Sequence, residues 1–157
     1  MVWIDWRIFT RRWLERAERG DRIIDDGDRF IALWMAFNGW MSGKFTEAKT
    51  DRQKIESVKK MQDFRDTFAH LREGNLAFRE SLGRLEGIPV VNMQFKENRE
   101  QVFRYDGTFE SLMEVIYRVR NNLFHGRKNI DEDKKDIELV SLAYQILLPL
   151  FKTYLSI

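Results

Sequence analysis

The sequence contains no cysteine, and this absence removes several kinds of chemistry at once. Disulfide bonds, thiol nucleophiles and cysteine-ligated zinc are all excluded. Histidine is nearly as scarce, because His70 and His125 are the only two in the chain. We therefore expect no metal site and no cofactor.

Long apolar runs are missing as well. The longest is FIALWMAF at 30–37, far shorter than the roughly 20 residues that a membrane-spanning helix needs. The N-terminal stretch MVWIDWRIFTRRW carries charges inside its apolar run and has no small-residue cleavage site, so it is not a signal peptide. These features predict a cytoplasmic protein that does not associate with a membrane.

The composition is sufficient for one well-packed domain. The chain has 157 residues, of which 43% are hydrophobic, and these include twelve Phe and five Trp. Such a chain can bury a sizeable core, so we expect a single folded domain over 1–157 and not a disordered chain. The net charge of +2 is too small to indicate a nucleic-acid binder, although Arg outnumbers Lys and Arg favours bidentate phosphate contacts.

The apolar residues recur at helical spacing, and only two prolines interrupt the chain. The pattern predicts an all-α fold, an antiparallel up-and-down bundle of four to five helices, with a small β-hairpin or ordered loop near 88–106. The expected helical stretches are about 5–19, 26–42, 51–86 as one helix or two, 108–124, and 137–155.

Several residues mark the expected helix ends. Asp51 and Thr108 are placed to cap helices, and Gly126 is placed to end the helix that Thr108 begins. The pair Gly74 and Asn75 is a weak point at which the 51–86 stretch could divide.

Arg120 attracts attention because of its place on the 108–124 helix. It follows Phe109 by eleven residues, about three helical turns, so it should project to the inner side of the helix. A guanidinium cannot lose its charge, so a buried one needs a carboxylate, a row of carbonyls or a phosphate. His125 stands in the last turn, where the helix dipole favours the imidazolium form. These two residues suit phosphate chemistry, but an ion-paired arginine and an ordinary basic helix ending would give the same pattern.

Asn38 is the one strongly polar side chain inside the apolar 30–41 run. A buried amide needs hydrogen-bond partners. Asn38 is either a core amide bonded to the backbone or a side chain that braces Arg120 and His125 from a neighbouring helix.

The hexapeptide RNNLFH at 120–125 resembles the Arg–polar–x3–His motif of the HEPN superfamily of helical ribonucleases. The longer run IYRVRNNLFHG at 116–126 and the stretch FIALWMAFN at 30–38 are similar to a bacterial and archaeal branch of that superfamily. Together with the helical layout, the resemblance spans most of the chain.

The resemblance implies a metal-independent endoribonuclease, a toxin or defence effector that leaves 2′,3′-cyclic phosphate ends. In that scheme His125 transfers protons, Arg120 holds the scissile phosphate and Asn121 orients the substrate or the histidine. It also implies a homodimer in which both motifs face one cleft, RNA as substrate, and an antitoxin or regulatory protein as partner.

One position departs from a known branch of the family. That branch carries a tyrosine two residues after the histidine, which its antitoxin modifies, whereas this chain has Arg127. Arg127 and Lys128 would instead add positive charge at the rim of an RNA cleft. The alternative function is a non-catalytic HEPN-like module that binds a nucleotide, RNA or a protein.

Overall fold

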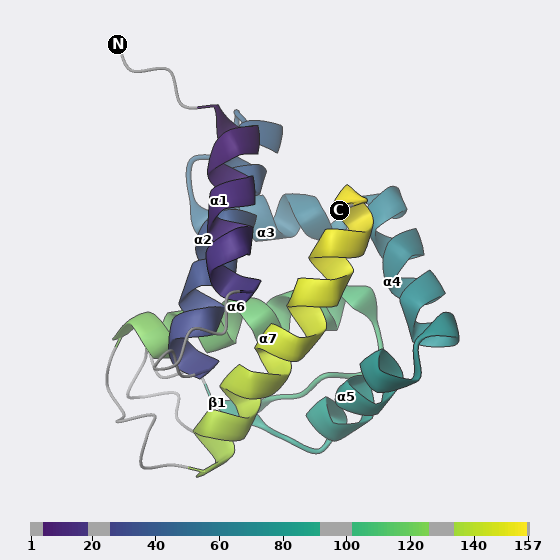
Figure 1. Ribbon diagram of the computed structural model, residues 1–157. Helices are drawn as coiled ribbons and strands as arrows, with labels where there is room; N and C mark the ends of the chain where they lie inside the picture. The colour runs from purple at the N-terminus through teal and green to yellow at the C-terminus, as the bar shows by residue number, and fades with distance from the viewer. Residues whose placement is uncertain (1–4, 19–25, 92–101, 126–133, 157) are drawn as a thin grey trace.

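The computed structural model describes residues 5–18, 26–91, 102–125 and 134–156 of the chain (Figure 1). These residues form seven α-helices and one two-stranded β-ribbon, which confirms the predicted all-α class. The helix count exceeds the predicted four to five because the stretch 51–86 divides into three helices. The elements are α1 Trp6–Glu18, α2 Asp26–Lys44, α3 Asp51–Lys59, α4 Gln62–Gly74, α5 Leu76–Glu86, β1 Val90–Val91, β2 Val102–Phe103, α6 Phe109–His125 and α7 Lys134–Leu155.

Helices α1 and α2 lie side by side and antiparallel, as Figure 1 shows. Their close approach depends on two glycines of α2, because Gly39 faces the Phe9 ring and Gly43 faces Trp6. The predicted ends of α1 and α2 agree with the structure to within two residues.

Helix α3 begins at Asp51, as the predicted stretch 51–86 does, but its capping residue differs from the predicted one. Thr50, and not Asp51, is its N-cap, since the Thr50 hydroxyl accepts a hydrogen bond from the backbone N–H of Gln53 at 3.1 Å. Asp51 is therefore the first residue inside the helix, and its carboxylate is free to meet other partners. Farther along, α4 ends at Gly74 and the Asn75 side chain caps α5, as the weak point in the sequence indicated.

Helix α6 starts as predicted, with Thr108 as its cap. The Thr108 hydroxyl accepts a hydrogen bond from the backbone N–H of Ser111 at 3.1 Å. Before it, β1 and β2 pair antiparallel with Val90 opposite Phe103, so the two ends of the predicted hairpin are confirmed. Residues 92–101 between the strands lie outside the described residues, as does the expected helix end at Gly126.

Helix α7 lies across the molecule in Figure 1 and packs against α2, α4, α5 and α6. Its Phe151 ring contacts Phe37 and Trp40 of α2, and Trp40 in turn contacts Phe64 of α4 and Tyr154 of α7. This aromatic cluster fixes α2 in the centre of the fold, so the polar residues along α2 occupy defined positions.

Candidate functional site

Arg120 lies on the inner flank of α6, as the helical period predicted. Its side chain is 21% exposed, and its neighbours Ile116 and Val119 belong to the buried core. The guanidinium carbon lies 4.6 Å from the centre of the Phe124 ring and 5.6 Å from that of Trp34 on α2. The two rings give the cation apolar walls and favourable cation–π contacts.

A carboxylate meets the Arg120 guanidinium, which is one of the three partners that the sequence allowed. The Arg120 Nη2 atom lies 2.8 Å from Asp51 Oδ2 of α3. Its Nη1 atom donates a 2.7 Å hydrogen bond to the side-chain oxygen of Asn121. The Arg120 Nε atom is buried and has no hydrogen-bond partner among the described residues. Arg120 is thus held at two of its nitrogens.

The polar contacts continue from Asp51 into α2. The Asp51 Oδ1 atom lies 3.6 Å from the ammonium group of Lys54, one turn along α3. Lys54 also donates hydrogen bonds to the Asn38 side-chain oxygen at 3.2 Å and to the Ser42 hydroxyl at 2.9 Å. Within the part of the chain that the structure describes, the Asn38 side chain is therefore bonded to a lysine and not to backbone. It is linked to Arg120 through Lys54 and Asp51.

A second charged cluster lies beside the first, one to two turns earlier on α6. Glu114 is buried at its centre and accepts hydrogen bonds from Arg52, Lys59 and Arg118 at 2.5 to 3.0 Å. Burial raises the pKa of the Glu114 carboxyl, but the hydrogen bonds from these three cations outweigh burial and lower the pKa to about 2. Glu114 is accordingly a carboxylate at any physiological pH.

The two clusters together connect α3 to α6 by reciprocal ion pairs. Consecutive residues of α3 supply an acid and a base, since Asp51 pairs with Arg120 and Arg52 pairs with Glu114. The Arg52 guanidinium also stacks over the Tyr117 ring at 4.5 Å. These contacts fix the register between α3 and α6.

The structure brings together part of the predicted site. Arg120, Asn121 and Asn38 belong to one connected set of polar contacts. His125 is the last residue of α6 and follows Arg120 by five positions. The His125 side chain, Arg127 and Lys128 lie outside the described residues, so their predicted roles remain predictions.

Sequence reasoning missed two members of the site. These are Lys54 and, in its role as the partner of Arg120, Asp51. Their spacing of three residues on one helix is typical of an ion pair, and the sequence carries no other signal for them. Nothing in the spacing connects them to Arg120, because the contact depends on how α3 packs on α6.

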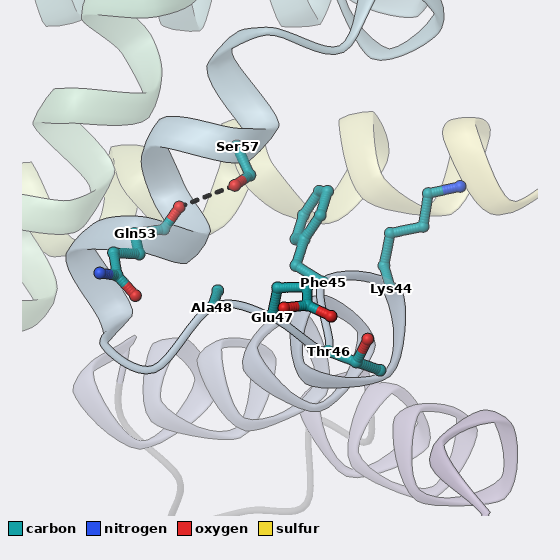
Figure 2. A pocket seen from close by; sticks show the side chains of 7 residues that line it. All are labelled: Lys44, Phe45, Thr46, Glu47, Ala48, Gln53 and Ser57. Carbon is teal, nitrogen blue, oxygen red and sulfur yellow. Dashed lines mark hydrogen bonds between the residues drawn. The ribbon is translucent and has the colours of Figure 1, made fainter.

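An open hollow of about 430 Å³ lies at the turn between α2 and α3, lined by residues 44–48 with Gln53 and Ser57. Figure 2 shows Lys44 and Phe45 on one side of it and α3 on the other, where the Ser57 hydroxyl donates to the Gln53 carbonyl oxygen at 2.9 Å. None of the predicted site residues lines this hollow. It is therefore separate from the contacts around Arg120.

The described residues also bear on metals and membranes. No group of three or more His, Asp or Glu side chains in that part of the chain is placed to hold a metal ion. Within the same residues, no helix combines the length and the apolar character needed to cross a bilayer.

Comparisons of the chain with protein-family models, with curated proteins and with solved structures find no match.

Proposed function

We propose that the protein is a metal-independent endoribonuclease of the HEPN type, acting in the cytoplasm as a toxin or defence effector. The observation that carries the proposal is the state of Arg120. The Arg120 side chain is only 21% exposed. Its guanidinium is held beside two aromatic rings and is bonded to Asn121, on the same helix end as His125. A fixed, partly desolvated guanidinium is well suited to stabilise charge on a phosphate.

The reaction would follow from these groups. The 2′-hydroxyl oxygen attacks the adjacent phosphorus while a base takes its proton, and the bond from phosphorus to the 5′-oxygen breaks while an acid gives that oxygen a proton. His125 serves the proton transfers at the 2′-hydroxyl or at the leaving 5′-oxygen, and Arg120 stabilises the charge that develops on the phosphoryl oxygens. The products are a 2′,3′-cyclic phosphate and a 5′-hydroxyl. Asn121 keeps the Arg120 guanidinium oriented through its 2.7 Å bond.

A homodimer would complete the site by facing two such helix ends across one cleft. Phe124 supports this arrangement, because it stands next to His125 in the chain, stacks on Arg120 and is nevertheless 42% exposed. Arg127 and Lys128 would line the rim and attract the RNA backbone. An antitoxin or regulatory protein would restrain the activity in the cell.

A second candidate function has its own observation in favour. Arg120 already has a carboxylate partner in Asp51, and Asp51 has a further partner in Lys54. In this reading, the ion pair between the Arg120 guanidinium and Asp51 serves only to hold α3 against α6. The protein would then be a non-catalytic HEPN-like module that binds a nucleotide, RNA or a protein partner.

The experiment that separates the two candidates is RNA cleavage in the presence of EDTA by wild type, Arg120→Ala and His125→Ala. We expect wild type to cleave, and each variant to lose at least about a hundredfold in rate, as removal of a proton-transfer group or a charge-stabilising group does. The cleaved ends should carry 2′,3′-cyclic phosphate.

Two matched controls use exposed residues outside the site, Arg79→Ala on α5 and His70→Ala on α4. Both should cleave as wild type does. Equal cleavage by Arg120→Ala and wild type would reject the proposed site. RNA binding without cleavage by wild type would favour the non-catalytic module.

A further inference from the structure

We infer that Asp51 is an internal counter-ion that occupies the place of the substrate phosphate on Arg120 and lowers the affinity of the site for RNA. This inference rests on the proposed function, since it concerns the same guanidinium. It assigns to Asp51 a regulatory contact that substrate must displace.

The geometry of the Asp51 contact is that of a phosphate contact. Carboxylate and phosphate oxygens meet a guanidinium through the same charge-assisted N–H···O bonds. Asp51 Oδ2 lies 2.8 Å from Arg120 Nη2, a normal distance for such a bond. An anionic oxygen of RNA that used the same N–H group of this nitrogen would have to take the position of the Asp51 oxygen.

Arg120 does not depend on Asp51 for its position. The guanidinium also stacks on Phe124 at 4.6 Å, faces Trp34 at 5.6 Å and donates to Asn121 at 2.7 Å. These three contacts come from α6 and α2, whereas Asp51 belongs to α3. The cation should therefore stay in place when Asp51 moves away.

Displacement of Asp51 should also cost little. The Asp51 and Arg120 side chains are 26% and 21% exposed, and partly exposed ion pairs contribute little because water competes for both partners. Lys54 offers the released carboxylate an alternative cation, already 3.6 Å away. Lys54 is itself held by Asn38 and Ser42, so this second partner is fixed before substrate arrives.

The test is RNA binding by Asp51→Asn, which removes the charge and preserves the shape of the side chain. The probe is a fluorescein-labelled 2′-O-methyl oligouridine, which lacks the free 2′-hydroxyl and so cannot be cleaved by transesterification. Fluorescence anisotropy at low, fixed ionic strength should show binding by Asp51→Asn about two- to fivefold tighter than by wild type, the range that a partly exposed ion pair allows. Asp51→Ser should show the same direction, and serves as the second variant if Asp51→Asn does not fold.

Glu56→Gln is the matched control for general electrostatics. Glu56 also lies on α3 and carries the same charge, but it pairs with Arg52 and Lys59 and not with Arg120. If only net charge mattered, Glu56→Gln and Asp51→Asn would tighten binding equally. We expect a larger gain from Asp51→Asn, and we expect that excess to disappear when both substitutions are compared in an Arg120→Ala background.

The outcomes separate this inference from the proposed function. Unchanged or weaker binding by Asp51→Asn, or a gain that survives in Arg120→Ala, overturns the role of Asp51, and cleavage by wild type in EDTA would still support the ribonuclease. If no protein cleaves RNA but Asp51→Asn binds the probe more tightly through Arg120, the ribonuclease fails and the counter-ion stands. Where wild type cleaves, Asp51→Asn should lower KM and leave kcat unreduced, since it acts on binding.

Discussion

At the scale of single residues, Glu114 is a buried acid whose pKa lies well below its ordinary value. Its side chain is 9% exposed, yet it remains charged because Arg52, Lys59 and Arg118 surround it. A buried charge is tolerated only when such partners offset its lost hydration. The ion pairs of Glu114 therefore make the packing of α3 on α6 sensitive to pH.

This sensitivity gives a prediction for stability. The pKa of Glu114 falls from the ordinary 4.5 to about 2 on folding. A lowered carboxyl pKa stabilises the fold above pH 4.5, and the contribution is lost as pH falls toward 2, because the unfolded chain then binds the proton more tightly. Wild type should lose on the order of 2 kcal/mol of unfolding free energy across this window from Glu114.

The measurement is urea unfolding between pH 7 and pH 2 for wild type and Glu114→Gln. The variant should be about 2 kcal/mol less stable at pH 7, because Arg52, Lys59 and Arg118 lose the carboxylate that they are paired with. The difference in unfolding free energy between the two proteins should shrink as the pH falls. Glu80→Gln on α5, where the side chain is exposed, is the control and should run parallel to wild type. A constant difference between Glu114→Gln and wild type at every pH would contradict the prediction.

The sequence predicted some of the site at this scale and not the rest. The helical period placed Arg120 on the inner side of α6, and the cost of an unpaired guanidinium called for a partner such as a carboxylate. The sequence could not identify Asp51 as the partner of Arg120, because a carboxylate at the start of a helical stretch also suits an N-cap. The neighbouring hydroxyl of Thr50 takes that role instead and leaves Asp51 for Arg120.

At the scale of elements, the close packing of α1 on α2 requires the absence of a side chain at Gly39. A Cβ atom there would lie 2.4 Å from Cδ1 of the Phe9 ring, which is too close for two non-bonded carbon atoms. The Phe9 ring or the whole of α1 must then move. Gly39 is buried in the interior of α2, so the room that it leaves for Phe9 outweighs its poor helix propensity.

Gly39→Ala should destabilise the protein by about 1 kcal/mol, as the overpacking penalty exceeds the gain in helix propensity. Gly83→Ala on α5 is the matched substitution, since an added Cβ would meet no atom within 4 Å beyond its own helix backbone and chain neighbours. It should stabilise by about 0.5–1 kcal/mol through the lower entropy of the unfolded chain. Urea midpoints of both variants provide the check, and a Gly39→Ala protein as stable as Gly83→Ala would refute the steric explanation.

The division of the stretch 51–86 shows why helix boundaries were harder to predict than helices. Its apolar stripe runs on through α4 and α5, so periodicity alone does not reveal the ends. Gly74 and Asn75 gave a local signal, and the chain divides there. The earlier break at Lys60 and Met61 contains neither glycine nor proline, so it has no local signal in the sequence. Val58 and Phe64, on either side of the break, are both buried in the core.

At the scale of the whole molecule, the proposed dimer would bring two α6 ends together. The exposed Phe124 ring lies at that end of α6, and Leu76 is an equally apolar residue with 61% exposure at the start of α5. Figure 1 places α5 at the lower right and the C-terminal end of α6 at the left. The two residues therefore distinguish a specific interface from general surface hydrophobicity.

Phe124→Ser should weaken the dimer about thirtyfold, as loss of an aromatic anchor from an interface centre does, whereas Leu76→Ser should leave the dimer intact. Light scattering over a range of protein concentrations measures the dimerisation of both variants.

Because Phe124 also stacks on Arg120, cleavage must be measured over the same range of concentrations. If the dimer forms the site, cleavage by Phe124→Ser recovers as concentration restores the dimer. A loss of cleavage at every concentration, with the dimer intact, would place Phe124 in the site of one protomer and remove it from the interface.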